Sequence, residues 1–171
     1  MRLKSTLLAT KLGSMLCIAD DEKLYLLEFV DREGLEAKQA RLSKQLKATI
    51  TPGETTISKQ TKKEIDAYFD GDLKQFTVPL QLIGSDFQKQ VWHALSKIPL
   101  GETRAYAEIA TALKRPKAYR AVAKANSTNP IAIIIPCHRV INSNGELGGY
   151  AGGIDRKQWL LQHEGVASKS W

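Results

Sequence analysis

The stretch Ile131-Ala132-Ile133-Ile134-Ile135-Pro136-Cys137-His138-Arg139-Val140 places a thiol directly after a run of five apolar residues. Such a run is typical of a buried strand, and Pro136 would end it. A thiolate beside an imidazole is a nucleophile, and Glu164 is the candidate for the third group that orients the histidine. A lone cysteine after an apolar strand is also commonly a small core residue. The stretch taken by itself leaves both interpretations open.

The residues before this stretch predict helices joined by short turns. Ser85-Asp86 is typical of an N-cap, and the helix that follows should end at the turn of residues 99–101. A second helix is expected over residues 103–113 and a short basic helix over residues 117–125, with Pro116 in the turn between them. This arrangement favours a helix-turn-helix, although any helical hairpin has a similar pattern.

Positive charge gathers in the same half of the chain. The formal net charge is +7 at pH 7, of which residues 1–85 contribute +1 and residues 86–171 contribute +6. Five basic residues and no acidic residue lie between Lys114 and Lys124. Such a patch is typical of a surface that binds a polyanion, with nucleic acid as the leading candidate. The alternative is a solvated basic face.

The first half of the chain predicts a small sheet with helices, so the whole is expected to be an α+β protein. A boundary near residues 83–86 divides it into domains 1–84 and 85–171. Pro79 lies in a predicted strand and favours an edge position, because proline lacks the N–H donor of a sheet. The expected elements of the first domain are a two-stranded hairpin in residues 1–30, helices over residues 32–48 and 58–71, and a strand over residues 76–82.

Length and composition exclude several classes of protein. The 171 residues are 43% hydrophobic, which is ordinary globular usage, and no apolar run approaches the roughly 20 residues of a membrane helix. The N-terminus shows no signal-peptide pattern. Cys17 and Cys137 are expected as free thiols in a reducing compartment. We therefore expect a cytoplasmic protein (nuclear in a eukaryote) that is monomeric and has no membrane partner.

Short motifs follow one another in a characteristic order along residues 84–165. Besides the motif around Cys137 they are Phe87-Gln88-x-x-Val91-Trp92, Gly101-Glu102-Thr103-x-x-Tyr106, Arg120-Ala121-Val122, Asn126-x-x-Asn129-Pro130, Gly149-Tyr150-x-Gly152-Gly153 and Arg156-Lys157-x-x-Leu160-Leu161-x-His163-Glu164-Gly165. In these motifs the chain resembles the O6-alkylguanine-DNA alkyltransferases, also called methylated-DNA–protein-cysteine methyltransferases. The first half resembles that family only in length and pattern.

The resemblance implies a DNA repair protein that moves an alkyl group from O6 of guanine, and also from O4 of thymine, to its own Cys137. The transfer is irreversible, so each molecule would act once, and no cofactor is implied. The damaged base would be flipped out of the duplex stack to reach the thiol. His138 would take the thiol proton through a water, with Glu164 orienting it. Tyr106 would protonate or hydrogen-bond N3 of the departing guanine.

The resemblance also implies a fold and a DNA-binding surface. The first domain would be ribonuclease-H-like and the second winged-helix-like, with the second helix of the helix-turn-helix in the minor groove of alkylated double-stranded DNA. Arg120 would fill the space left by the flipped base, and Arg139 would brace the site. The other residues expected to bind DNA are Lys117, Lys124, Ala121, Ala125 and Asn129, and those expected to wall the alkyl pocket are Val140, Tyr150, Ala151 and Gly152.

Three departures from the family pattern bear on function. Some members hold zinc in the first domain, but here that half contains only Cys17 and no histidine, so no metal is expected. Ala123 stands where many relatives have glycine. Tyr119 is bulkier than the residue usual before the arginine, and the sequence leaves open whether it packs inward or stacks beside DNA.

Two other classes of function compete with repair. Some relatives bind alkylated DNA without transferring the group, but they lack the acceptor cysteine that Cys137 provides. A cysteine hydrolase would need an oxyanion loop, which is not recognisable here, and would leave the basic helix without a purpose. Alkyl transfer to Cys137 is therefore the favoured function.

Overall fold

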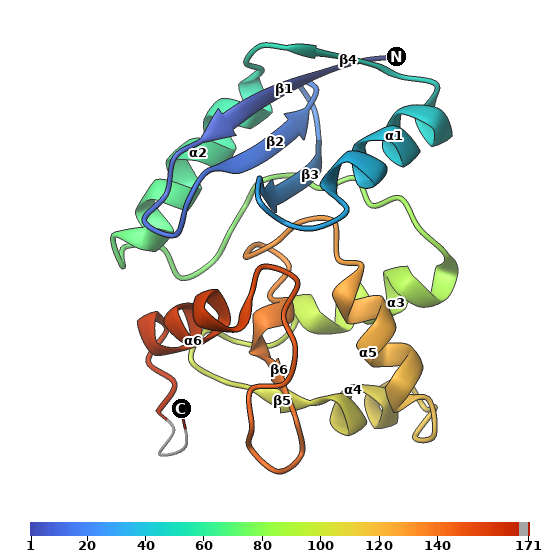
Figure 1. Cartoon of the computed structure of the whole chain (residues 1–171), viewed down its shortest axis with the longest axis vertical. Coiled ribbons are helices and arrows are strands. Elements are labelled where there is room, and N and C mark those ends of the chain that lie inside the picture. Colours follow the sequence, from blue (N-terminus) through green and yellow to red (C-terminus); the bar gives the residue numbers. More distant parts are fainter. Residues whose placement is uncertain (168–170) are drawn as a thin grey trace. The chain divides into compact units, whose positions relative to one another are not determined.

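A four-stranded sheet forms the centre of the first unit, Met1–Ile83, in the computed structural model, which describes residues 1–167 and 171 (Figure 1). The strand order is β3-β2-β1-β4. Strand β2 pairs antiparallel with β1 and with β3, whereas β4 pairs parallel with β1. The elements of this unit are β1 (Arg2–Leu8), β2 (Met15–Ala19), β3 (Leu24–Phe29), α1 (Leu35–Leu46), β4 (Thr49–Pro52) and α2 (Thr56–Phe69).

Helices α1 and α2 cover opposite faces of this sheet. Ile18 of β2 belongs to a core cluster with Leu35 of α1. The neighbouring Cys17 is hydrogen-bonded to Thr61 of α2. Because successive side chains of a strand point to opposite faces, both faces of the sheet are covered, and every residue of β3 is buried.

The predicted helices of the first unit are confirmed as α1 and α2. The predicted two-stranded hairpin in residues 1–30 is confirmed as the antiparallel pair β2 and β3, and β1 and β4 are strands that the sequence did not predict. The short strand β4 has no alternating apolar pattern that could have revealed it. It is held beside β1, where the N–H of Thr49 donates to Met1 O and the N–H of Gly53 donates to Ser5 O, each at 3.0 Å.

The predicted strand over residues 76–82 is wrong. Among the described residues it makes only an isolated bridge, which joins Leu80 to the start of β3. The N–H of Thr77, which a strand ladder would need, donates instead to the buried Glu64 carboxylate on α2 at 2.6 Å. Pro79 has no N–H to offer. A buried side chain and a proline therefore remove the donors that would extend the sheet.

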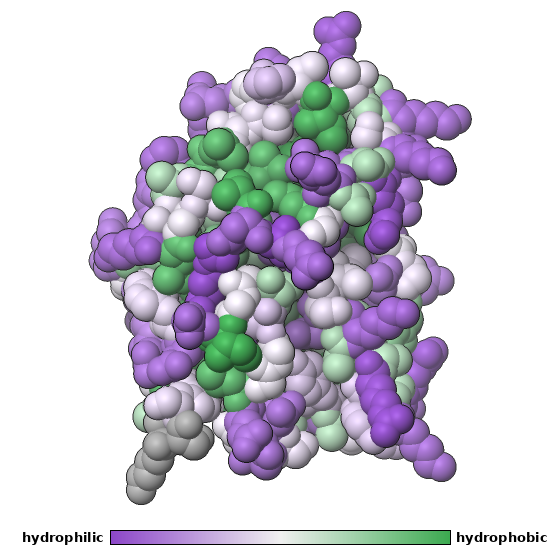
Figure 2. Space-filling view, viewed as in Figure 1, coloured by the Kyte–Doolittle hydropathy of each residue, from purple (hydrophilic) through white to green (hydrophobic). Residues whose placement is uncertain are grey.

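The first unit also exposes apolar side chains. Figure 2 shows hydrophobic residues gathered on the part of the surface that this unit forms. A surface pocket of about 820 Å³ lies beside the start of α1, and its lining includes Leu7 and Val30, which are 64% and 43% exposed. No helix in the described part of the chain is long and apolar enough to cross a membrane.

Helices α3, α4 and α5 pack against one another in the second unit, Gly84–Trp171 (Figure 1). The N-cap predicted at Ser85 is present, because Ser85 Oγ accepts from the N–H of Gln88 at 3.1 Å. Trp92 Nε1 on α3 donates to Ala125 O on α5 at 2.9 Å. The elements are α3 (Asp86–Ser96), β5 (Arg104–Ala105), α4 (Tyr106–Ala112), α5 (Tyr119–Ser127), a 3-10 turn (Cys137–Arg139), β6 (Val140–Ile141), which pairs parallel with β5, and α6 (Ile154–His163).

The predicted buried strand over residues 131–135 is also wrong, although the segment is almost entirely buried. Asn129 Oδ1 accepts from the N–H of Ile131 at 3.0 Å, and Asn129 Nδ2 donates to Ile135 O at 2.8 Å. These two bonds fold the apolar run into turns, and Ile133 takes a φ of 71°. A β-branched residue in the left-handed region is a rare conformation. Burial therefore explains the isoleucines, whereas the turns are formed by the bonds of Asn129 together with the segment's own backbone bonds, in which the Ile135 N–H donates to Ile131 O.

Candidate active site

Cys137 opens the 3-10 turn at the end of this folded loop, and only 6% of the residue is exposed. Its N–H donates to Ile135 O at 2.8 Å. Its carbonyl oxygen accepts from Asn126 Nδ2, which comes from α5, at 3.4 Å. The backbone of the cysteine is thus held both by its own loop and by the basic helix, and this fixes the thiol near that helix.

Glu164, at the end of α6, joins the two residues that follow the cysteine. His138 Nε2 lies 2.6 Å from Glu164 Oε2, and Arg139 Nε donates to Glu164 Oε1 at 2.7 Å. Arg139 Nη1 also donates to the carbonyl oxygen of Ile98 at 2.7 Å. All three ionisable side chains are buried, and each is paired or hydrogen-bonded by another member of the network. The structure therefore brings together the residues expected to orient and brace the site.

The protonation of His138 follows from this network. Burial alone raises the pKa of Glu164, but hydrogen bonds from His138 and Arg139 and their charges lower it to about 2, so it is a carboxylate at neutral pH. Burial lowers the pKa of His138, and the charges of Arg139 and Lys157 add to this against the opposing effect of Glu164. A carboxylate can only accept, so the hydrogen of the neutral imidazole must be on Nε2.

The other ring nitrogen, His138 Nδ1, then carries a lone pair. This atom is buried and has no hydrogen-bond partner among the described residues. A neutral imidazole held by a carboxylate on one nitrogen and open on the other is the arrangement of a general base. His138 is therefore able to accept a proton, directly or through a water.

Two further ionisable side chains are close enough to Cys137 for its charge to affect them. Burial raises the pKa of the Tyr106 hydroxyl, and a thiolate at Cys137 raises it further. Lys157 is completely buried, and its Nζ donates to Val140 O at 2.6 Å and to Gly149 O at 3.1 Å. Burial lowers the pKa of Lys157 to about 8, and a negative charge on Cys137 opposes that shift. A phenol and an ammonium thus lie within electrostatic range of the thiol.

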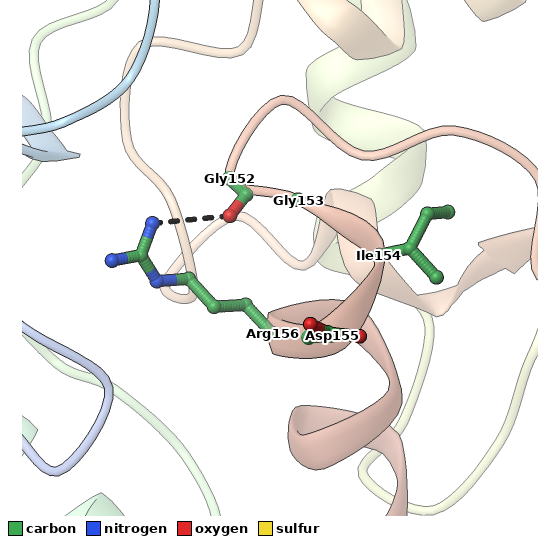
Figure 3. Close-up of a pocket in the computed structure, with 5 residues that line it drawn as sticks. All are labelled: Gly152, Gly153, Ile154, Asp155 and Arg156. Atoms are coloured by element: carbon green, nitrogen blue, oxygen red, sulfur yellow. Dashed lines mark hydrogen bonds between the residues drawn. The ribbon is translucent and has the colours of Figure 1, made fainter.

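The residues expected to wall the alkyl pocket occupy different positions. Val140 is completely buried at the start of β6. The Tyr150 ring meets the His138 ring edge to face, with centroids 6.5 Å apart. Gly152 lines a surface pocket of about 370 Å³ at the start of α6, where Arg156 Nη1 donates to Gly152 O at 3.1 Å (Figure 3). Ala151, between them, is exposed. The segment thus runs from the histidine to an open pocket.

Helix α5 presents the basic side chains expected to bind DNA. Arg120, Ala121 and Lys124 are exposed on this helix, and Lys117 is exposed in the turn before it. Ala125 is different, because it is 3% exposed and its carbonyl oxygen is bonded to Trp92. Its methyl group faces the interior, so the expectation that Ala125 contacts DNA does not fit the structure.

Asn129 is also buried rather than on the surface, with 3% of the residue exposed. Both polar atoms of its amide are used in the loop before the cysteine. This position does not fit the expected side-chain contact with DNA, and Asn129 instead holds the loop before Cys137. The exposed basic residues of the helix-turn-helix are therefore the direct candidates for DNA contacts.

The second cysteine differs chemically from Cys137. Cys17 is completely buried in β2, and burial raises its pKa to about 12 despite its hydrogen bond with Thr61. It is a protonated core thiol. Among residues 1–167 and 171, no group of three or more histidine, cysteine, aspartate or glutamate side chains is placed to hold a metal ion.

Two family models together match almost the whole chain. The 6-O-methylguanine DNA methyltransferase ribonuclease-like domain matches residues 3–82, and the DNA binding domain of the same methyltransferase matches residues 86–166. The chain belongs to the 6-O-methylguanine DNA methyltransferase family. This confirms the resemblance drawn from the motifs and extends it to the first half of the chain.

Named relatives of this methyltransferase chain agree with the family. A methylated-DNA–protein-cysteine methyltransferase of Methanosarcina mazei is 57% identical over 106 residues, which are 62% of this chain and 67% of that protein. The crystal structure of Mycobacterium tuberculosis OGT in complex with DNA has a TM-score of 0.80 at 39% identity, covering 96% of this chain and 92% of that one. The crystal structure of the M. tuberculosis O6-methylguanine methyltransferase has a TM-score of 0.82 at 38% identity, covering 98% and 96%.

Lys157 is the residue of this methyltransferase site that sequence reasoning missed. A signal was present, because residues 157, 160, 161 and 164 follow the spacing of the buried stripe of a helix. Leu160 and Leu161 are completely buried in this stripe, and Lys157 and Glu164 are buried with them. A lysine and a glutamate at core positions of an amphipathic helix require partners inside the protein. The same reasoning would have identified both Lys157 and Glu164 as buried residues with partners inside the protein.

Proposed function

We propose that this methyltransferase repairs DNA by transferring the alkyl group from O6 of guanine to Sγ of Cys137, once per molecule. The observation that carries the proposal is the buried network in which Glu164 accepts the Nε2 hydrogen of His138, the residue that follows Cys137 in the chain, and leaves Nδ1 without a hydrogen-bond partner among the described residues. A thiol with a neutral base beside it can form the nucleophilic thiolate. The same turn that carries the thiol also carries this base.

The transfer proceeds in three balanced changes. The thiol proton of Cys137 moves to His138 Nδ1, through a water if one lies between them. The thiolate then attacks the alkyl carbon, the new C–S bond forms as the C–O6 bond breaks, and the bonding electrons leave with guanine. Tyr106 gives its hydroxyl proton to N3 of the leaving base and regains one from the imidazolium. The products are a neutral thioether and unmodified guanine, and no step returns the thiol.

Lys157 supports the thiolate before the attack. Its ammonium is buried close enough to Cys137 for the charges to interact, and it is tethered to the carbonyl oxygens of Val140 and Gly149. Val140 is the first residue of β6, and Gly149 directly precedes Tyr150, which we propose forms a wall of the alkyl pocket. The same two hydrogen bonds therefore fix both the ammonium of Lys157 and the backbone beside the pocket. Ala151 and Gly152 complete the wall of the pocket.

DNA is bound through the helix-turn-helix, with α5 in the minor groove of the duplex. Lys117 and Lys124 neutralise phosphates, and the small side chain of Ala121 allows the helix to approach closely. Arg120 enters the stack where the alkylated base has been flipped out. The single-turnover chemistry requires a reduced thiol and no partner subunit, so we place the protein in the cytoplasm as a monomer. O4-alkylthymine, which has a similar alkyl–oxygen bond, is a second substrate.

Peptide mapping after reaction with DNA tests the proposal. Incubation with a duplex that contains O6-methylguanine should add one methyl group to the peptide with Cys137 and none to the peptide with Cys17, whose thiol is buried and protonated. Cys137→Ala should bind the same duplex but remain unmodified. A methyl group on another residue, or methyl removal by Cys137→Ala, would refute the proposed acceptor.

A further inference from the structure

Tyr119 is a large aromatic residue on the surface of the proposed DNA-binding helix. It is the first residue of α5 and is 45% exposed. The sequence left open whether this ring packs inward or faces DNA, and the structure shows that a large part of it faces solvent. Exposure alone does not indicate a function, because single apolar residues are common on protein surfaces.

A second observation concerns the neighbour of this tyrosine. The Arg120 Cζ atom lies 5.8 Å from the centroid of the Tyr119 ring, within the range of a cation–π contact. No acidic residue occurs anywhere in residues 109–145, so the sequence around this arginine offers it no carboxylate partner. The guanidinium of Arg120 is thus in contact with an aromatic ring and has no carboxylate near it in the sequence.

Another cation–π pair in the same unit shows why this one is unusual. Arg115 Cζ lies 5.4 Å from the ring centroid of Phe87, and that pair ties the turn before α5 to α3. Tyr119 and Arg120 are consecutive in sequence, so their contact ties no two parts of the fold together. Its effect is limited to the position of the guanidinium and of the ring on the exposed face.

We propose that Tyr119 is a DNA-contacting residue that works with Arg120 to hold the flipped state of the duplex. This inference rests on the proposed function, in which α5 faces DNA. The ring holds the guanidinium of Arg120 in the free protein. When Arg120 enters the duplex, the ring stacks on the nucleobase next to the flipped nucleotide. Stacking on an aromatic side chain tolerates every base, so it suits a protein that must act in any sequence context.

Single-turnover kinetics on two forms of one oligonucleotide test this role. Tyr119→Ala should slow methyl transfer from O6-methylguanine in a duplex about tenfold, in keeping with the loss of one base–aromatic stack. The same variant should stay within about twofold of the parent protein on the single strand, where no flipped state has to be held. Tyr119→Phe keeps the ring and should match the parent on both. Lys117→Ala, at saturating DNA, controls for the loss of a neighbouring DNA contact.

Fluorescence of 2-aminopurine placed beside the lesion reports the stacking itself. In complexes with the inactive Cys137→Ala protein, adding Tyr119→Ala should brighten the probe, because the ring no longer quenches it. Duplex repair by Tyr119→Ala at the parent rate, an equal loss on both DNA forms, or an unchanged probe would overturn the inference. Failure of the proposed function would look different, because the unaltered protein would then leave the lesion in place and Cys137 unmethylated.

Discussion

At the scale of single residues, Glu164 connects the chemistry of the site to its stability. One carboxylate accepts from His138 through one oxygen and from Arg139 through the other, at 2.6 and 2.7 Å. It thereby fixes which ring nitrogen of His138 carries the hydrogen, and it neutralises the buried guanidinium of Arg139. Substitution of Glu164 should therefore impair alkyl transfer and folding together, whereas substitution of an exposed acid should impair neither.

The pKa of Glu164 predicts how stability depends on pH. It is about 2 in the folded protein and near 4.5 in the unfolded chain, so the unfolded state binds the proton more tightly. The stabilisation is therefore fully present above pH 4.5 and is lost as pH falls towards 2. At about 1.4 kcal/mol per pKa unit, it amounts to about 3 kcal/mol.

Denaturant unfolding of the parent protein and Glu164→Gln between pH 2 and 7 measures this dependence. The difference between the two unfolding free energies should be constant above pH 4.5 and should shrink below it. A difference that stays the same down to pH 2 would show that the carboxylate does not gain its low pKa from folding.

At the scale of elements, the loop before Cys137 and the basic helix α5 have different functions. The loop positions the thiol through Asn129, and α5 carries the exposed cations that we propose bind DNA. The loop and the helix are linked by a hydrogen bond, which Asn126 Nδ2 of α5 donates to the carbonyl oxygen of Cys137. A change in either element should therefore have its own measurable signature.

Asn129→Ala should destabilise the loop strongly. It would leave the buried N–H of Ile131 without a partner, at about 1–3 kcal/mol, and would remove one of the two hydrogen bonds to Ile135 O, which keeps the bond from the Cys137 N–H. The melting temperature should fall by several degrees, at roughly 2–4 °C per kcal/mol for a chain of this length. Asn144→Ala is the matched control, because Asn144 accepts one bond, from the N–H of Glu146, in an exposed turn. Equal melting of the two variants would contradict the role of Asn129.

The basic helix predicts two kinds of DNA-binding variant. Lys117→Ala removes one phosphate contact, so affinity for any duplex should fall and the slope of its salt dependence should decrease by about 1. Arg120→Ala should chiefly slow repair of duplex DNA, because the flipped state loses the group that fills the stack. Single-turnover rates and salt titrations separate the two effects. Arg120 has no special role if its loss slows duplex repair no more than the loss of Lys117.

The helices and the chemical site were predictable from the sequence, whereas several backbone paths were not. Helical spacing and the cap at Ser85 marked α3 to α5, and the motif around Cys137 marked the proposed acceptor. The pattern of residues 131–135 reports burial only, and the side chain of Asn129 folds it into turns. Glu64 likewise takes a backbone donor of the predicted strand over residues 76–82. Long-range bonds made by one polar side chain are not visible in local periodicity.

At the scale of the whole molecule, the proposed single use of each chain makes its stability after the reaction as important as its stability before it. Methylation adds a methyl group to a residue that is 6% exposed and removes the thiol proton. Extra volume in a close-packed site typically costs about 1–3 kcal/mol. That is a sizeable fraction of the roughly 5–15 kcal/mol that stabilises a folded domain.

The spent protein should therefore melt several degrees below the fresh one, at roughly 2–4 °C per kcal/mol. It should also be cut more readily by protease near residues 148–153, the segment that walls the pocket. Matched melting curves of methylated and unmodified samples decide this, with protein incubated with undamaged duplex as the control. Equal or higher melting of the methylated sample would mean that the pocket accepts the group without strain.

Titration with excess substrate shows whether alkyl transfer to Cys137 is irreversible. The protein is incubated with a large excess of duplex that contains radiolabelled O6-methylguanine, and label on the protein is followed to its plateau. We expect a plateau of one methyl group per chain, with an equal amount of guanine restored in the DNA, and no label on Cys137→Ala. Repair of many lesions per chain, or a plateau that persists in Cys137→Ala, would contradict this expectation.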